Sequence, residues 1–515
     1  MAISWIGPSV AGVVVLCSVV VFVLYQRYRP GLRSIPGPFA ASFTDLWRFV
    51  AVYNGRFDLT SQTLHDKYGD LVRMGPKCVS VADPREIRQI YGISRLFQKK
   101  EREQSDYYRV AQPLVNGKPV TSLFMILDED QHKIAKRPIA HAYAMTSLLD
   151  YEPFVDSTSR TLVEQLTRLY ADKGKVCDFG EWLQWYAFDV IGEMTFSNRF
   201  GFLEQGRDVG GIIKALNKAG TYVALVGQMP WLDYLLAKNR VWGGVFSKDK
   251  TGISKFVLQF LKPRIEEADK ARLRPDGEKT PLEFKDRTDF TAKFISAFDK
   301  YHGSIPQSQL LGWSLSNINA GSDTSAIALR AIFHFLLLNP STMAKLMAEL
   351  DSANLSPLPQ WRETSNLPYL GAVIKEALRL HTPVGFILER IVPKGGATLC
   401  GHFFPEGTIV GCNPAVIHRD KRVYGRRYSV DSYRPERWPE ADDEERGEME
   451  RCFMAFGSGK RTCIGKNISL LEMYKLVPLL LKRFKFRLVD PDKKLTIWNT
   501  FFVHQKGLDV YVETA

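Results

Sequence analysis

Residues 456–465 read Phe-Gly-Ser-Gly-Lys-Arg-Thr-Cys-Ile-Gly, and they decide the fold. The stretch fits the pattern Phe-x-x-Gly-x-Arg-x-Cys-x-Gly at every fixed position and leads into an apolar helical run, 468–481. A free cysteine is usually a small buried hydrophobe. That alternative does not account for the four other fixed positions around Cys463, so the sequence indicates a special role for this cysteine.

The other six cysteines argue against a disulfide framework or a zinc site. They lie far apart in a chain of 515 residues and form no Cys-x-x-Cys pair. The composition, with 45% hydrophobic and 24% charged residues, is that of a globular protein and excludes collagen, coiled coil and disorder. The net charge of +13 favours an acidic partner or a membrane surface.

Upstream of the cysteine, residues 306–338 predict one long helix. The segment lacks proline after Pro306, and its apolar residues recur at helical spacing, so the helix would extend roughly 45 to 50 Å. Its middle, residues 320–325, is small and polar (Ala-Gly-Ser-Asp-Thr-Ser). Glycine there costs about 1 kcal/mol relative to alanine, and burying Asp323 costs more unless it is paired. This favours a functional site over a solvated kink or a Ser/Thr cluster bonded back to the helix.

The first 26 residues predict a membrane anchor helix. They carry no Asp, Glu, Lys or Arg and are long enough to span about 30 Å of hydrocarbon. Basic residues follow the apolar run, so the positive-inside rule predicts a single span with the bulk of the chain in the cytosol. Residues 27–44 are basic and proline-rich and predict a stiff hinge. Residues 45–515 predict one mainly helical domain, with strand-like pieces near 70–85 and 390–412.

The 456–465 loop resembles the haem-binding loop of the cytochrome P450 family, and the likeness covers nearly the whole chain. It implies the P450 fold, mainly α with small β-sheets (α+β), preceded by one N-terminal transmembrane helix. The run 385–396 is most similar to fungal members near pisatin demethylase.

The resemblance implies haem b (iron protoporphyrin IX) as cofactor, with Cys463 as the thiolate ligand of the iron. Gly459 and Gly465 would let the backbone turn tightly enough for the sulfur to approach the iron from one face. Amides at the start of the next helix can stabilise the negative sulfur. Arg461 would meet a haem propionate, and Phe456 would shield the sulfur.

A second set of motifs implies a structural triad and a proton-delivery site. Glu376 and Arg379 match the family's Glu-x-x-Arg pair, and with Arg437 they would form a buried charged triad that fixes the Cys463 loop. In the middle of the long helix, Gly321 would leave room for dioxygen. Asp323 and Thr324 would deliver protons.

One departure from the family concerns an early helix. His132 stands in the place of the usual tryptophan and Lys136 in the place of the usual arginine, and both are expected at the haem propionates together with Arg390. Arg137 is an alternative to Lys136. Lysine binds a carboxylate as a point charge and arginine as a bidentate fork, so the choice affects geometry more than charge.

The predicted function is a membrane-anchored haem-thiolate monooxygenase in the endoplasmic reticulum, its catalytic domain in the cytosol. It would oxidise a lipophilic terpenoid, polyketide or alkaloid intermediate of fungal secondary metabolism, using O₂ and electrons from NADPH through an NADPH-cytochrome P450 reductase. The expected partners are this substrate, the reductase and the lipid bilayer, with no nucleic acid. Two alternatives are a haem-thiolate isomerase or dehydratase that needs no reductase, and a non-catalytic membrane-anchored binding protein.

Two surfaces follow from the same family positions. The reductase is expected to dock near Cys463 on a face bearing the cations Lys133, Lys136, Arg137, Arg451, Lys460 and Lys466. The substrate pocket is expected to draw on segments 106–124, 203–232, 318–324, 384–388 and 500–502.

Overall fold

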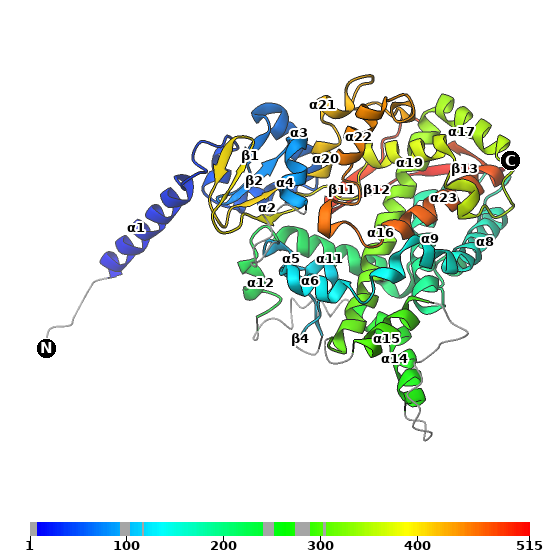
Figure 1. Cartoon of the computed structure of the whole chain (residues 1–515), viewed down its shortest axis with the longest axis horizontal. Coiled ribbons are helices and arrows are strands. Elements are labelled where there is room, and N and C mark those ends of the chain that lie inside the picture. Colours follow the sequence, from blue (N-terminus) through cyan, green and yellow to red (C-terminus); the bar gives the residue numbers. More distant parts are fainter. Residues whose placement is uncertain (1–7, 93–103, 116–117, 240–251, 273–288, 302–304) are drawn as a thin grey trace.

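A single long helix, α16 (Ser308–Leu338), runs through the body of the protein (Figure 1). The computed structural model describes residues 8–92, 104–115, 118–239, 252–272, 289–301 and 305–515. At 1.5 Å per residue α16 is about 46 Å long, which confirms the helix predicted over 306–338. Asn339 and Pro340 end it, and α17 (Pro340–Ser352) begins directly afterwards.

Most of the described chain is helical. The helices before α16 are α1 (Pro8–Arg27), α2 (Leu46–Tyr53), α3 (Phe57–Tyr68), α4 (Ile87–Tyr91), α5 (Tyr107–Val110), α6 (Glu129–Lys136), α7 (Met145–Leu148), α8 (Glu152–Leu169), α9 (Phe179–Phe196), α10 (Phe202–Gln205), α11 (Ile212–Val226), α12 (Trp231–Leu235), α14 (Ile253–Arg272) and α15 (Phe290–Lys300). Those after α17 are α18 (Trp361–Thr364), α19 (Pro368–Leu380), α20 (Pro414–Ile417), α21 (Lys421–Tyr424), α22 (Asp443–Cys452) and α23 (Lys466–Arg483).

The strands form small sheets beside this helical body. One sheet has the order β1 (Leu71–Arg73), β2 (Cys78–Val81), β9 (Ile409–Gly411), β6 (Arg390–Ile391), in which only the β2–β9 pair is parallel. This sheet confirms strands near 70–85 and 390–412. The hairpin β7 (Ala397–Leu399) to β8 (His402–Phe404) lies in the second of these regions.

Further pairings were not predicted. The order β10 (Phe484–Leu488), β13 (Asp509–Thr514), β5 (Cys177–Asp178) joins the chain's end to a strand more than 300 residues earlier. Two hairpins, β3 (Leu114–Val115) to β4 (Lys118–Pro119) and β11 (Thr496–Thr500) to β12 (Phe502–Lys506), complete the set.

The core forms where α16 packs against α9, α19 and α23, its most extensive contacts being with α9. Phe179, Phe188, Trp313 and Phe333 are almost completely buried in this cluster. At about 25 cal/mol per Å² of buried apolar surface, such large side chains supply much of the stabilisation. The core thereby fixes the position of the polar middle of α16.

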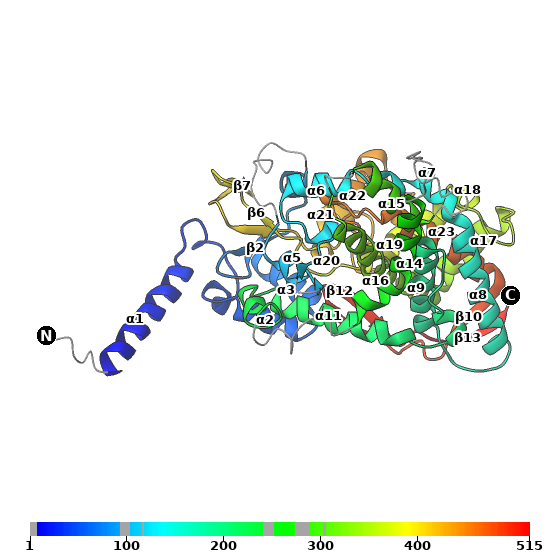
Figure 2. The same ribbon diagram turned by 90° about the horizontal axis from the view of Figure 1, so that it is seen from below.

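The N-terminal helix α1 projects away from the body, at the end opposite the C-terminus, as Figure 2 also shows. Its apolar side chains, among them Val15 and Leu16, are exposed. Within the described residues no single helix is both long and apolar enough to cross a membrane. The bent pair α16–α17 meets the requirement only jointly, with a bend of 109°, and Gly12–Arg27 is a shorter apolar helix. Residues 1–7 of the predicted anchor lie outside the described residues, so the anchor stays a prediction.

The segment after α1 packs onto the body instead of extending as a free linker. Leu32 and Ile35 are buried. The Arg73 guanidinium on β1 donates hydrogen bonds to the carbonyl oxygens of Gln26 (2.6 Å), Arg27 (2.9 Å) and Leu32 (3.1 Å). These contacts fasten the end of α1 and the segment 27–44 to the four-stranded sheet.

Candidate active site

Cys463 lies on a tight loop immediately before α23. Of the seven cysteines, Cys463 and Cys17 are exposed, and Cys17 belongs to the projecting helix α1. The Cys463 amide donates to the Phe456 carbonyl oxygen at 2.9 Å, which closes the loop on itself. Gly465 is the N-cap of α23, so the sulfur lies near the start of that helix.

The turns of this loop require glycine at two positions. Gly457 has a φ of +71° and Gly459 a φ of +68°, in the left-handed region that disfavours side chains. A Cβ on Gly459 would lie 1.7 Å from the Tyr91 carbonyl oxygen, so any side chain there would push the loop away from the end of α4. Gly465 has a φ of −84°, which any residue adopts. The tight turn predicted at Gly465 is therefore at Gly457.

Opposing influences act on the pKa of Cys463. Burial raises the pKa of the Cys463 thiol. The backbone N–H groups of Gly465 and Lys466 lower that pKa, as do the charges of Lys136 and Lys466. The side chain is open on one face, but the protein around the loop still makes burial the largest influence. A bound metal cation would remove the proton outright.

Four basic side chains, two of them on α6, one on β6 and one in the loop, gather at this place. Lys136 Nζ donates to the Lys460 carbonyl oxygen at 3.2 Å, and Arg461 donates to the Ile126 carbonyl oxygen at 2.8 Å. Arg461 also pairs with Glu129 at 3.2 Å. The positive charges of Arg461, Lys136 and Arg390 all act on the pKa of His132. The structure thus brings together His132, Lys136, Arg390 and Arg461, which the sequence placed at one anionic group.

This basic cluster has a hydrogen-bond donor that no described residue uses. Arg390 is buried on β6, and its Nε has no hydrogen-bond partner within the described residues. Burial, followed by the charge of Arg461, lowers the pKa of His132 to about 4, so this imidazole is neutral at pH 7. Arg137, the alternative to Lys136, is exposed directly after the end of α6. Lys136 therefore has the better placement.

Glu376 and its two arginines form a buried ion-pair cluster. Arg379 donates to both Glu376 carboxylate oxygens at 2.9 Å, and Arg437 Nε lies 3.3 Å from Glu376 Oε1. Trp438 Nε1 donates to the same carboxylate at 3.1 Å. All three charged side chains are at most 3% exposed. Such a cluster is stable only because backbone carbonyls satisfy the remaining guanidinium N–H groups.

His418 connects this cluster to the cysteine loop. The Arg379 Nη1 donates to the His418 carbonyl oxygen at 2.8 Å, and His418 Nε2 accepts a hydrogen bond from the Met454 amide at 2.8 Å. Met454 lies two residues before Phe456. Burial lowers the pKa of His418 to about 3, so its ring stays neutral and remains able to accept this bond. The triad thus supports the segment that leads into the loop.

On α16, Thr324 and Asp323 have different partners. The Thr324 hydroxyl donates to the Ala320 carbonyl oxygen at 2.7 Å, on a side where Ala320 is exposed. Asp323 is buried and accepts a hydrogen bond from Gln184 Nε2 on α9 at 2.6 Å. Arg330 Nη2 donates to Gln184 Oε1 at 3.0 Å.

A cavity of about 480 Å³ adjoins Asp323's partners. Gln184, Arg330 and His504 line it, together with other polar and charged residues of α9, α11 and β12. Gln184 therefore touches both the cavity and Asp323. Water in the cavity would reach within one side chain of Asp323.

Gly321 has a neighbour that was not expected. A Cβ built on it would lie 3.1 Å from Ile191 Cγ1 on α9. The missing side chain thus allows α16 and α9 to approach closely. The room that Gly321 leaves is occupied by Ile191 of α9, and Ala320 is the exposed residue at this point of α16.

Comparison with known proteins decides the family. The sequence profile described as Cytochrome P450 matches residues 44–512. The chain belongs to the cytochrome P450 family. A cytochrome P450 monooxygenase of Aspergillus terreus is 44% identical over 481 residues, covering 92% of this chain and 94% of that protein. The monooxygenase cicH of Emericella nidulans is 41% identical over 488 residues, 94% of each chain. The monooxygenase mpaDE' of Penicillium brevicompactum is 39% identical over 503 residues, 96% of this chain and 57% of that protein.

The P450 is accordingly a haem-thiolate monooxygenase, and its cofactor is haem b. The residues present fit that group. An exposed sulfur lies at the start of a helix, and a basic cluster with an unpartnered buried Arg390 Nε suits the two carboxylates of a haem.

Three of the five segments expected at the substrate, 106–124, 384–388 and 500–502, meet in an aromatic cluster. The Phe501 ring lies 5.9 Å from Tyr107, 5.4 Å from Phe124 and 5.9 Å from Phe386, measured between centroids. Phe501 has a φ of +81°, an outlier for a bulky residue. The surrounding rings hold it in this conformation and direct it into the cluster.

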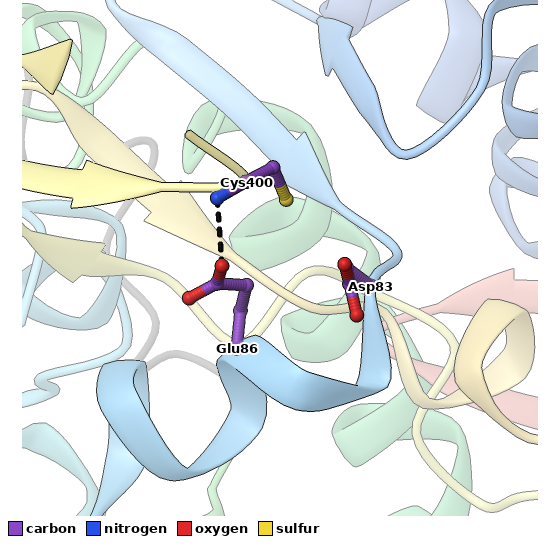
Figure 3. Close-up of side chains that lie close together, drawn as sticks. All are labelled: Asp83, Glu86 and Cys400. Carbon is purple, nitrogen blue, oxygen red and sulfur yellow. Dashed lines mark hydrogen bonds between the residues drawn. The ribbon is translucent and has the colours of Figure 1, made fainter. Parts of the chain in front are cut away.

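A separate group of acidic and sulfur side chains is structural. Asp83, Glu86 and Cys400 have ligand atoms within 4.8 Å of one another (Figure 3). Asp83 is already held by the Arg85 guanidinium at 2.6 Å, and Glu86 Oε1 accepts from the Cys400 amide at 2.6 Å. Burial raises the pKa of Cys400 to about 12, so it remains a thiol. These contacts attach the β7–β8 turn to the start of α4.

The sequence reasoning missed Gln184, Arg330, His418 and Glu472. The first three act through long-range contacts that no local pattern reveals. Glu472 did leave a signal, since it is the one acidic residue in the otherwise apolar and basic run 468–481.

Proposed function

We propose that this P450 oxidises a lipophilic small molecule of fungal secondary metabolism, anchored in the endoplasmic reticulum membrane and supplied with electrons by NADPH-cytochrome P450 reductase. The aromatic cluster around Phe501 carries the substrate assignment. The charges nearest to it neutralise each other, because Arg48 and Glu389 are both buried and pair at 2.9 Å. The resemblance of residues 385–396 to pisatin demethylase supports a secondary-metabolism substrate.

The cofactor would be held by residues of the loop and the basic cluster. Cys463 would ligate the iron, and His132, Lys136, Arg390 and Arg461 would hold the propionates. When bound, the haem supplies oxygen activation, in which one atom of O₂ enters the substrate and the other leaves as water. The chain's own part is to hold the thiolate, exclude water and orient the substrate. Phe456 and the turn at Gly459 keep the sulfur in place.

Phe124 offers a direct test of the substrate site, because it belongs to the aromatic cluster but is 40% exposed and contributes little to the core. Phe124→Ala is expected to weaken binding of apolar ligands about tenfold, equivalent to about 1.4 kcal/mol. The measurement is the ligand-induced spin-state change of the haem against a panel of apolar and charged compounds. Phe403→Ala, at an exposed phenylalanine on β8, serves as the control. Spin-state changes with small polar acids alone would refute the proposal.

Proton delivery is assigned to Thr324 and Asp323. A proton must arrive before the second oxygen atom can leave as water, and a hydroxyl on the exposed side of α16 can pass it on. Gln184 would hold the Asp323 carboxylate beside the cavity, and water would have to carry the proton to it, because an amide side chain does not relay protons. Gly321 serves this arrangement by letting α9, with Gln184, approach α16.

Thr324→Ala is expected to bind haem and substrate normally but to divert reducing equivalents into hydrogen peroxide. Product formed per NADPH should fall about tenfold or more, because a positioned proton donor contributes about 10²- to 10⁴-fold. The assay compares NADPH consumed, peroxide released and product formed. Ser322→Ala is the matched control, since its hydroxyl donates to the Ile318 carbonyl oxygen at 2.6 Å but is buried. If Thr324→Ala forms as much product per NADPH as the unsubstituted enzyme, the Thr324 hydroxyl has no role in proton delivery.

The alternative, a haem-thiolate isomerase or dehydratase, has different requirements for its reaction. Such an enzyme needs the thiolate but neither a reductase nor proton delivery. Product formation that continues without NADPH and O₂ would favour it over the proposed monooxygenase reaction.

Membrane attachment is assigned to α1, because a row of exposed valines and leucines on a projecting helix is unfavourable in water. Arg27, Arg29 and Arg33 follow it on the side expected to face the cytosol. In the full chain, Val15→Asp with Val19→Asp should abolish co-flotation with lipid vesicles. Flotation equal to that of the unsubstituted chain would reject this anchor.

Reductase docking is assigned to the face near Cys463. Lys136 and the ion pair of Arg461 with Glu129 hold α6 against the cysteine loop, and the neighbouring cations Lys133, Arg137 and Lys466 are exposed. Steering by such charges weakens with salt. Electron transfer that is insensitive to ionic strength and to Lys466→Glu would reject this docking face.

A further inference from the structure

A carboxylic acid is sealed into the junction of four helices behind the site. Glu472 lies on α23, nine residues after Cys463, and its side chain is fully buried. The helices α8 and α16 pack against α23, and α9 packs against both α8 and α16. Ser325, the residue after Thr324, is its neighbour on α16. Glu472 thus lies between the helix that carries the thiolate loop and the helix that carries the proton-delivery residues.

Glu472 has no partner that would stabilise a negative charge. Neither of its carboxyl oxygens has a hydrogen-bond partner within the described residues. The Ser325 hydroxyl is near enough to lower the pKa of Glu472 in part, but it is engaged with the Ser469 hydroxyl at 2.9 Å. An unpaired buried carboxylate is very unfavourable, so the group is held neutral instead.

The charged groups around the junction make a negative charge on Glu472 still less favourable. Lys475, one helical turn along α23, is fully used by Glu152 at 2.6 Å and Asp156 at 2.9 Å on α8. These three side chains together already carry one more negative than positive charge. From α9, Tyr186 bonds to Ser159 at 3.1 Å, and burial raises its pKa well above its usual value, with Glu472, Asp156 and Glu193 adding to the rise. Tyr186 therefore stays neutral while Glu472 titrates.

Burial raises the pKa of Glu472 to about 8. The ordinary pKa of a glutamate is 4.5, so the unfolded chain releases this proton above pH 4.5. The folded chain keeps the proton on Glu472 up to about pH 8. The folded state therefore loses stability as pH rises through this window. Glutamine or methionine would match Glu472 in size without destabilising the fold at neutral pH. Packing alone therefore does not explain a glutamate at this position.

We propose that Glu472 is the redox-linked proton site of this P450. Near and above pH 8, where Glu472 has lost its proton in the ferric enzyme, one electron from the reductase to the Cys463-bound iron would cause the Glu472 carboxylate to take up one proton from solvent. When the electron leaves, the proton leaves too. The added electron and proton cancel in charge, so the low-dielectric interior gains no net charge. The inference rests on the proposed ligation by Cys463.

The test is the reduction potential of the haem-loaded enzyme, measured between pH 7 and 9. In the unsubstituted enzyme, reduction should become less favourable with rising pH, by at most about tenfold per pH unit, which is 59 mV for one electron. In Glu472→Gln, which keeps the size and removes the titration, the potential should be independent of pH in this range. Glu181→Gln removes a different acid, which is only half-buried but also has a raised pKa, at the far end of α9, and it should keep the unsubstituted slope. The same slope in Glu472→Gln as in the unsubstituted enzyme would overturn the proposal.

Two further measurements separate this result from a failure of folding or of ligation. The carbon monoxide spectrum of each variant shows whether the thiolate ligand is in place, so a changed slope with an intact spectrum concerns Glu472 alone. If Glu472→Gln does not take up haem, Glu472→Met replaces it, and the same flat profile is expected. The ratio of the folding constants of Glu472→Gln and the unsubstituted chain should also rise by up to about tenfold per pH unit between pH 5 and 8. A ratio independent of pH would show that Glu472 is not a neutral acid and would overturn the proposal.

Discussion

Replacement of Cys463 by alanine is expected to leave the fold intact and to abolish product formation. The side chain is exposed, so its removal opens no cavity in the core, and the free energy of unfolding of the haem-free protein should change by no more than about 0.5 kcal/mol. Even a residue that only supports a metal ligand costs about 10- to 100-fold when replaced. Loss of the ligand itself should therefore reduce product formation by more than 100-fold. Haem content and turnover are the measurements.

The matched control is Cys400→Ala. Cys400 is a free, partly exposed cysteine in the β7–β8 turn. The Cys400→Ala variant should keep full activity and haem content. Wild-type turnover in Cys463→Ala would mean that another residue ligates the iron, and the role assigned to the 456–465 loop would be wrong.

Replacement of Arg379 by leucine is expected to destabilise the protein by about 3–5 kcal/mol, because Glu376 would be left with a buried, uncompensated charge. The segment leading to Met454 would also lose its support, since the Arg379 guanidinium positions the His418 carbonyl group. Urea unfolding of the haem-loaded protein measures the change. Haem uptake should fall with it.

Lys375 offers the control on the same helix. It forms an ion pair with Glu450 in which both side chains are more than one third exposed, so Lys375→Ala should cost no more than about 1 kcal/mol. Equal destabilisation by the two substitutions would show that the triad has no special structural role.

The features predicted correctly from sequence are those with a local signature. The cysteine loop has fixed glycines, α16 has helical spacing and a proline end, and the strands near 70–85 and 390–412 are bounded by glycine and proline. Each of these signals lies within a few residues of the element that it specifies.

The contacts that position the site could not be predicted in the same way. Gln184 reaches Asp323 across 139 residues of sequence, and β13 pairs with β5 across more than 300. Such contacts depend on how the helices pack, which a single sequence does not specify. Gly321 illustrates the limit: its small size was read correctly, but its neighbour, Ile191, comes from α9.

The segment 27–44 shows a related effect. Its prolines predicted a stiff hinge, and α1 ends at Arg27, before Pro30, but the partner that holds the segment to the body is Arg73 on β1. A lone arginine in a short strand gives no sign in the sequence that it will bind three carbonyl groups of another segment.

The absorbance spectrum of the reduced, carbon monoxide-bound protein tests the central claim most directly. Only thiolate ligation of the iron moves the main band strongly to the red. The account predicts this red-shifted band in the full chain, from the Cys463 thiolate. A main band at the position of a histidine-ligated haem, in protein that is folded and fully loaded with haem, would contradict it.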